Sequence, residues 1–275
     1  MKTILLATDF SNVARNAANY AADMATACNA NLLLLHVYQM PLLFLQVPLP
    51  VTIDEMLQDA QKELELIQKE LTTRTRGKIA IDTEIRMGSF HDELKTVCER
   101  IEPSYLVMGS QGSTAAEHLI FGSHTIYAMK HSTWPLITVP PGTSFSSLKK
   151  IALACDFNKE VDEVPLGEIK TLVNDFNAEL FILNVCKGGE INPNNIFESG
   201  LFSKMLAPVE PHFRFITNED TDKGIMDFVK TNNIDLLIML PGRHCLLNRL
   251  IHKSNTKQLI LNSDAPIMAI HLNDS

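Results

Sequence analysis

Apolar residues in the first half of the chain follow two patterns that alternate with each other. Short apolar or alternating segments, which are typical of strands, lie at residues 4–7, 32–37, 79–85, 105–108 and 136–139. Between them, apolar residues recur at helical spacing over residues 12–28, 53–73, 90–100 and 124–130. Strands that alternate with helices predict β-α-β units around a parallel sheet, with Ser11 as the N-cap of the first helix.

The same order of segments occurs a second time later in the chain. The recurring pairs are residues 4–10 with 151–157, 29–37 with 177–185, and 106–108 with 237–239. Without a gap after the last pair, Ser123, Thr125, Ser132 and Pro135 match Ser254, Thr256, Ser263 and Pro266. A repeat of this length predicts two tandem domains of the same fold. We expect them over residues 1–142 and 148–275, joined by a linker rich in Pro, Gly and Ser.

The composition narrows the classes of function. With 275 residues, 45% of them hydrophobic and 20% charged, the chain is typical of a soluble globular protein. Its net charge of -8 argues against a general binder of nucleic acid or of a membrane surface, which is usually basic. No segment approaches the roughly 20 apolar residues of a membrane span. The five cysteines form no C-x-x-C pair, which favours reduced thiols and a cytoplasmic location.

A glycine-rich loop follows the predicted strand at residues 105–108. Two residues separate Gly109 from Gly112, and Gly122 and Ser123 come nine residues later at the start of a predicted helix. Glycines let the backbone approach an anion and adopt positive φ, and N–H groups at a helix N-terminus bind negative charge. We expect Ser123 to cap that helix or to hydrogen-bond a phosphate. The loop therefore predicts a phosphate site, although tight turns alone would leave the same pattern.

The order of these features resembles the universal stress protein family over both halves of the chain. The shared features are a strand that ends in Asp9, the strand at residues 32–37 and the G-x2-G-x9-G-S motif. The resemblance implies an α/β fold of two tandem, doubly wound, Rossmann-like domains, each with a parallel five-stranded sheet. Because single-domain members commonly dimerise, it also implies that the two domains pack as a pseudo-dimer, and a further homodimer is open.

The resemblance also implies a nucleotide site. In the ATP-binding branch of the family this motif holds the phosphates, the Asp after the first strand contacts the adenosine end, and a Val after the second strand contacts adenine through its backbone. By position, the cofactor-binding residues are Asp9, Val37, Met108, Gly109, Gly112, Gly122 and Ser123, flanked by Thr8, Ser110 and His124. The implied cofactor is ATP, with AMP or ADP as alternatives, and no residue can be named as a ligand for Mg.

The second copy departs from the motif at each of its glycines. In the ungapped alignment Gly109, Gly112 and Gly122 are replaced by Leu240, Arg243 and Lys253, whereas Asp156, Val185, Ser254 and Thr256 remain. A bulky Leu cannot reproduce the close approach of glycine, and the two cations either pair with an anion or are ordinary solvated residues. We expect a degenerate second domain that supports the first one structurally.

Other polar clusters give weaker indications. His118, His124 and His131 lack the Cys or carboxylate that would complete a metal site, so we expect surface or site-edge positions for them. At the start of its helix, His124 should have a lowered proton affinity because of the helix dipole. The cluster of His244, Cys245 and His252 matches no metal or nucleophile motif. No second acid accompanies Asp9 for general acid–base catalysis.

The segment at residues 41–53 is apolar, interrupted by proline, and without periodicity. It is expected to form a lid over the cleft or an intersubunit patch, or else to pack on its own domain. A region of similar composition lies at residues 191–211.

Together these features predict a cytoplasmic, ATP-binding sensor or regulator of the stress response, with at most weak ATPase activity. Two other classes stay open: a nucleotide-independent scaffold and a nucleotidyl-transfer enzyme of the same superfamily. Against the enzyme, the H-I-G-H and S-G-G-x-D-S loops of such proteins are missing after the first strand, where residues 9–12 (DFSN) stand. A Walker-type loop is absent from the sequence as well.

Overall fold

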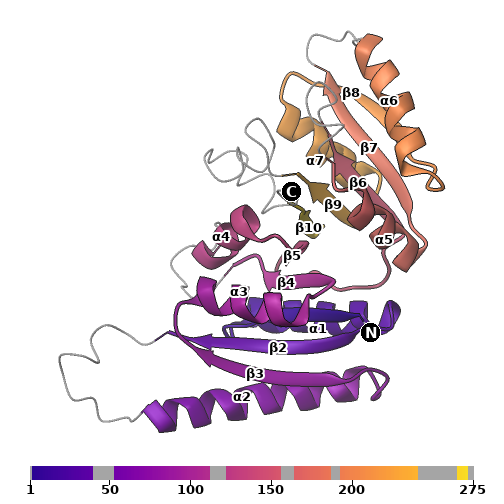
Figure 1. Ribbon diagram of the computed structural model, residues 1–275. Helices are drawn as coiled ribbons and strands as arrows, with labels where there is room; N and C mark the ends of the chain where they lie inside the picture. Colours follow the sequence, from indigo (N-terminus) through magenta and orange to yellow (C-terminus); the bar gives the residue numbers. More distant parts are fainter. Residues whose placement is uncertain are drawn as a thin grey trace.

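A computed structural model describes residues 2–39, 53–111, 122–155, 164–186, 193–240 and 265–271. Strands and helices alternate along most of these residues, except that β5 is followed by β6 and β9 by β10 without a described helix between them (Figure 1). The first half contains β1 (Thr3–Ala7), α1 (Asn12–Ala27), β2 (Asn31–Tyr38), α2 (Ile53–Arg74), β3 (Ile81–Met87), α3 (Phe90–Ile101), β4 (Tyr105–Gly109), α4 (Ser123–His131) and β5 (Leu136–Val139). The second half contains β6 (Lys150–Ala154), α5 (Leu166–Phe176), β7 (Glu179–Cys186), α6 (Pro193–Leu206), β8 (His212–Thr217), α7 (Thr221–Thr231), β9 (Leu236–Met239) and β10 (Ile267–Ala269).

The described strands form one sheet in the order β3-β2-β1-β4-β5-β10-β9-β6-β7-β8. All neighbouring pairs are parallel except β5 and β10, which run antiparallel with Ile137 opposite Met268. Two parallel five-stranded sheets of the same strand order therefore join edge to edge, which confirms the predicted α/β fold. At the junction the Thr138 hydroxyl donates to the carbonyl of Ile267 over 3.2 Å.

The helices cover the two faces of this sheet as two layers (Figure 1). In the first half, alternate strand residues such as Leu6 and Val107 pack with α1 and α2. In the second half, the corresponding strand residues pack with α5 and α6. Their neighbours Leu5 and Leu106 pack on the other face with α3 and α4, or with α7. Because side chains alternate along a strand, this division fixes which residues at a strand end can meet the same helix.

Two local predictions are confirmed, the cap of α1 and the buried stripe of α2. The Ser11 hydroxyl accepts a hydrogen bond from the amide of Ala14 at 3.2 Å and so caps α1. In α2 the apolar stripe that includes Leu64, Ile67 and Leu71 is buried. The cysteines in the described residues are free thiols. None of the described helices is long and apolar enough to cross a membrane.

The third strand was predicted two residues too early, at 79–85 rather than 81–87. The turn after α2 carries two consecutive residues with positive φ, Arg76 and Gly77. Strand pairing then begins with Ile81 opposite Leu32 and continues to Met87 opposite Tyr38. An apolar residue at both 79 and 81 fits the period of a strand, so the pattern alone could not locate its start.

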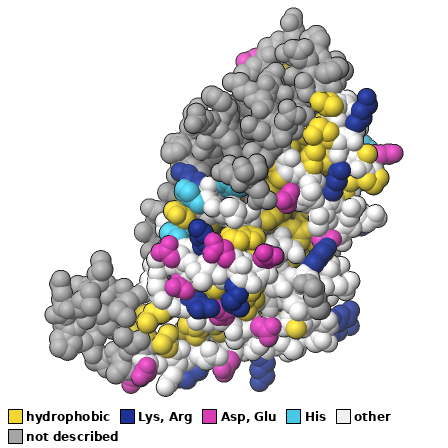
Figure 2. All heavy atoms as spheres, viewed as in Figure 1, with side chains coloured by type: hydrophobic (Ala, Val, Ile, Leu, Met, Phe, Trp, Pro, Cys, Tyr) yellow, Lys and Arg dark blue, Asp and Glu magenta, His cyan; other side chains and the backbone are white. Residues whose placement is uncertain are grey.

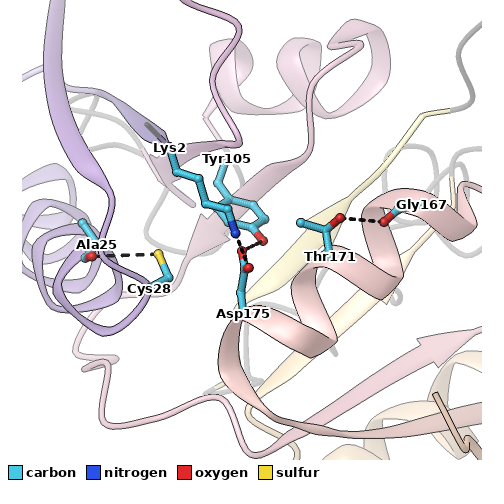
Figure 3. Close-up of polar contacts among 7 residues, drawn as sticks. All are labelled: Lys2, Ala25, Cys28, Tyr105, Gly167, Thr171 and Asp175. Atoms are coloured by element: carbon cyan, nitrogen blue, oxygen red, sulfur yellow. Dashed lines mark hydrogen bonds and ion pairs between the residues drawn. The ribbon is translucent and has the colours of Figure 1, made fainter. Parts of the chain in front are cut away.

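The two halves are tied together on one side of the sheet by a buried carboxylate (Figure 3). Asp175, near the end of α5, accepts a hydrogen bond from the Tyr105 hydroxyl at 2.9 Å and pairs with the ammonium of Lys2. Nearby, the amide of Asn16 in α1 donates to the carbonyls of Pro140 and Thr143 in the predicted linker. These contacts join β1, β4 and α1 of the first half to residues that follow it in the chain.

The region at residues 191–211 contains helix α6, which contributes Phe202 and Leu206 to the core. The apolar segment at residues 40–52 lies outside the described residues, as do Gly112, His118 and the second-half cations Arg243 and Lys253.

Candidate functional site

The carboxyl edge of the first half is the end of the sheet where β1, β2 and β4 stop, at Ala7, Tyr38 and Gly109. Met108 and Val37 are buried there, 6% and 9% exposed, on the face covered by α3 and α4. Ser110 continues the ladder of β4, since its amide donates to the carbonyl of Val139 at 3.0 Å. It lies two positions after Met108, so its side chain lies on the same face.

At the end of β1 the chain makes a sharp turn that presents Asp9. Thr8 is buried, and its hydroxyl accepts from the amide of Phe10, a residue with a φ of 65°. The Asp9 carboxylate in turn accepts from the amide of Ser11 at 3.1 Å. Its negative charge opposes the lowering of the pKa of His36 in β2 and of His124 in α4. The hydroxyl of Thr8 is thus engaged in forming the turn, whereas Asp9 is exposed.

Phe10 and His36 support this turn and were not predicted from the sequence. The two rings stack with centroids 4.3 Å apart, and Nδ1 of His36 lies 2.9 Å from the carbonyl of Thr8. Burial lowers the pKa of His36. In the second half the amide of Asn184 donates to the carbonyl of Cys155 at 3.1 Å. In both repeats, therefore, a side chain of the second strand hydrogen-bonds a backbone carbonyl just after the first strand. In the sequence this similarity is visible only as the alignment of His36 with Asn184.

Gly109 allows α1 to lie very close to β4. A Cβ atom at this position would lie 3.1 Å from Cγ1 of Val13, 3.2 Å from the carbonyl carbon of Val13 and 3.3 Å from the amide nitrogen of Ala14. Neither Gly109 nor Gly122 has positive φ, contrary to the expectation for the loop glycines. Gly109 is therefore required for close packing of a helix, and its role is structural before any ligand is considered.

The N-terminus of α4 is built directly against the end of β4. The Gly122 amide donates to the carbonyl of Ser110 at 3.1 Å, and the Thr125 hydroxyl donates to the carbonyl of Gly109 at 3.0 Å. Gly122 is the N-cap and no side chain caps the helix, so of the two roles expected for Ser123 the capping role is wrong, and the hydrogen bond to a phosphate stays a prediction. Ser123 is the first helical residue and is exposed. The first turn of α4 contains no acidic residue, so its N–H groups keep their attraction for an anion.

Two buried polar atoms beside this helix have no hydrogen-bond partner among the described residues. They are the hydroxyl oxygen of Ser110, a residue only 2% exposed, and Nδ1 of His124. The pKa of His124 is lowered, as expected, but the main cause is burial, which Asp9 partly opposes. A buried hydroxyl without a partner costs free energy, and a ligand that reaches it would remove that cost.

A second histidine, His91 of α3, meets His124 and was not predicted. The His91 and His124 rings lie 5.2 Å apart between centroids, and Phe90 lies 4.5 Å from His124. Nδ1 of His91 is also buried without a partner among the described residues. Each histidine is the second residue of its helix, which is the one hint that the sequence contains.

The predicted site residues in the described part of the chain thus gather at one edge. Asp9, Ser110, Gly122, Ser123 and His124 surround the start of α4, with Val37 and Met108 beneath them, whereas Thr8 and Gly109 serve the turn and the packing of α1. No group of three His, Cys, Asp or Glu side chains within the described ranges could hold a metal ion.

The second half differs at the same place. Leu240, the counterpart of Gly109, is buried in the cluster that contains Cys155 and Val164. Helix α5 has 11 residues where α1 has 16, and it begins only at Leu166. A large side chain thus occupies the position where α1 approaches β4 in the first half.

Comparison with known proteins agrees with this architecture. The profile of the universal stress protein family matches residues 1–140. A universal stress protein from Archaeoglobus fulgidus has a TM-score of 0.71 at 19% identity, over 99% of this chain and 97% of its own. A protein of unknown function from Pseudomonas aeruginosa has a TM-score of 0.61 at 12% identity, over 100% of this chain and 94% of its own. A universal stress protein in complex with cAMP aligns with 51% of this chain and 98% of its own, at 23% identity and a TM-score of 0.39.

No curated protein matches. Because the family profile covers more than half of the sequence, the chain belongs to the universal stress protein family.

Proposed function

We propose that the first half binds an adenine nucleotide, ATP in the first instance, and that the protein acts as a cytoplasmic sensor or regulator in the stress response. The observation that carries this proposal is the start of α4. Its N–H groups have no side-chain cap and no acidic neighbour in the first turn, and they adjoin the buried, unpartnered hydroxyl of Ser110. A phosphate at this position would satisfy both groups.

The position of Asp9 supports the orientation that family resemblance implies. Its carboxylate accepts from the amide of Ser11 just after β1 and is exposed, and its charge raises the pKa of His124 at the start of α4. A carboxylate in this position accepts hydrogen bonds from ribose hydroxyls, while Val37 and Met108 supply an apolar floor. The nucleotide would lie across the carboxyl edge with its phosphates at α4.

The second half is proposed as a structural partner that binds no nucleotide. Buried Leu240 stands where the first half has Gly109. We propose a division into domains at residues 1–142 and 148–275, and a pseudo-dimer whose axis passes near the antiparallel pair β5 and β10. A further homodimer would then use surfaces other than these two strands.

Isothermal titration calorimetry of the whole chain with ATP tests the proposal, with Ser110→Ala as the key variant. Removing a hydroxyl that has no partner leaves the free protein as stable as before or more so, so weaker binding cannot be ascribed to unfolding. The matched control is Ser104→Ala, at the opposite end of β4. We expect weaker ATP binding for Ser110→Ala by roughly threefold to tenfold and no change for Ser104→Ala.

A second matched pair tests the adenosine end. Asp9→Asn should weaken binding by about tenfold or more because a charge-assisted hydrogen bond is lost. Asp82→Asn makes the same charge change near the amino end of β3 and should have no effect. Absence of ATP binding by the wild type would leave the nucleotide-independent scaffold as the better function. A stoichiometry of two nucleotides per chain would overturn the degenerate second half.

A further inference from the structure

We propose that His91 and His124 form a subsite for the terminal phosphates of a nucleoside triphosphate, so that the first half distinguishes ATP from AMP. The inference rests on the proposed function and adds to it a residue, His91, that lies outside the glycine-rich motif. It concerns the class of ligand that the site prefers.

The two histidines come from different helices and meet beside the start of α4. His124 lies one residue beyond Ser123, and its ring is in contact with that of His91 at the start of α3. On its other side His91 stacks on Tyr127, with centroids 3.6 Å apart, so its ring is held in place. Figure 2 shows histidine side chains gathered over α4 on this face of the molecule.

Both imidazoles keep one ring nitrogen buried and without a partner among the described residues. A histidine that only filled space in the core would be expected to have both polar atoms satisfied. Ser110 follows Met108 by two residues, so its side chain lies on the same face of the sheet. Its hydroxyl is also buried without a partner among the described residues. Three polar atoms without partners therefore adjoin a helix N-terminus that has no side-chain cap, which is what a polyphosphate requires.

Burial first, and then the surrounding charges, set the protonation of the pair. Burial, and then the proximity of His124, lowers the pKa of His91, with a further contribution from His131, while Asp92 opposes the shift. The pKa of His124 is lowered by burial and partly restored by Asp9. Both shifts favour the neutral imidazole in the free protein. A phosphate beside the two rings would favour the charged form, so ATP binding should take up protons.

Adenosine monophosphate lacks the two phosphates that would reach this pair. Loss of one imidazole should therefore weaken ATP binding and leave AMP binding unchanged. A purely structural role for His91 would instead weaken both ligands, because the start of α4 would move for both. The ratio of the two affinities separates these cases.

The test is calorimetry of the whole chain with ATP and with AMP in one magnesium-containing buffer at pH 7. The variants are His91→Gln and His124→Gln, with His212→Gln as control, because His212 lies in β8 of the second half, away from this ring stack. We expect His91→Gln to weaken ATP binding roughly tenfold and AMP binding less than twofold. Repeating the ATP titration in two buffers of different ionisation enthalpy should show fewer protons taken up by His91→Gln than by the wild type.

Each outcome decides between separate claims. If the wild type binds neither ligand, the proposed function fails. If it binds ATP but His91→Gln binds both ligands like the wild type, or loses both equally, the subsite is refuted while nucleotide binding stands. Equal proton uptake by the wild type and both variants would also overturn it, since the imidazoles would then carry no proton in the complex.

Discussion

Substitution of Gly109 by alanine should destabilise the first half, even though alanine is normally the more stable residue. The new Cβ would lie 3.1 to 3.3 Å from three atoms of α1, and two of these belong to the backbone at Val13 and Ala14. Backbone atoms of a helix cannot turn aside as a flexible side chain can, so α1 must shift by a few tenths of an ångström. Overpacking of this kind costs about 1–3 kcal/mol.

An opposing effect reduces the net change. Replacing glycine restricts the unfolded chain and by itself stabilises a protein by about 0.4–1 kcal/mol. The difference predicts a net loss of up to about 2.6 kcal/mol in the free energy of unfolding, and of about 1.3 kcal/mol at the middle of both ranges. Urea denaturation followed by circular dichroism measures this loss.

Gly167 provides the matched control. It lies in the first turn of α5, and a Cβ atom there would meet nothing within 4 Å. Gly167→Ala should therefore stabilise the chain by up to about 1 kcal/mol, because alanine is the better helix former. If Gly109→Ala proved as stabilising as Gly167→Ala, the close approach of α1 to β4 would be refuted. Addition of Val13→Ala should restore only part of the loss, since two of the three close atoms are main-chain atoms.

Three further predictions concern stability. Asp175→Asn should lower the free energy of unfolding in urea by about 1–3 kcal/mol. The substitution removes the negative charge that accepts a hydrogen bond from the Tyr105 hydroxyl and pairs with the ammonium of Lys2 (Figure 3). Leu240→Gly should cost about 3–5 kcal/mol in the same assay through loss of buried surface and gain of chain flexibility, and calorimetry should show no second nucleotide site. Stability should also fall as the pH drops below about 6.5: burial lowers the pKa of His36, so the unfolded state binds the proton first. Urea denaturation at pH 7.5 and 5.5 measures this fall, and His36→Gln should make it smaller.

Much of the fold could be predicted from the sequence because strands and helices differ in the period of their apolar residues. Ser11 could be assigned as a cap because a hydroxyl before a helical segment acts locally, within three residues. The start of β3 could not be predicted, because it is set by pairing of Ile81 with Leu32, far apart in sequence. Local patterns thus predicted the elements, and long-range pairing decided where one of them begins.

The candidate site could be predicted only as far as the motif extends. Asp9 and Gly122 fall at strand and helix ends, where a resemblance by position suffices. His91 belongs to another helix and joins His124 only through the packing of α3 against α4, which no spacing in the sequence encodes. The hydrogen bond that the Thr8 hydroxyl accepts from the amide of Phe10 likewise becomes visible only in the folded structure. Such contacts depend on how the helices lie on the sheet, and the pattern of apolar residues constrains that weakly.

The two halves differ at the position of Gly109 and Leu240. This difference is better explained if the residue at this position and the placement of the helix after the first strand depend on each other than if glycines were lost independently. A glycine after the fourth strand is required only where a helix backbone approaches that strand, as α1 does at Val13. In the second half the described helix starts at Leu166, and Leu240 is buried in the same cluster as Val164 just before it. Once a leucine is buried there, a helix in the position of α1 would collide with it. Restoring the glycine alone would then leave a cavity, because the close approach that shapes the first site depends on the helix as much as on the loop.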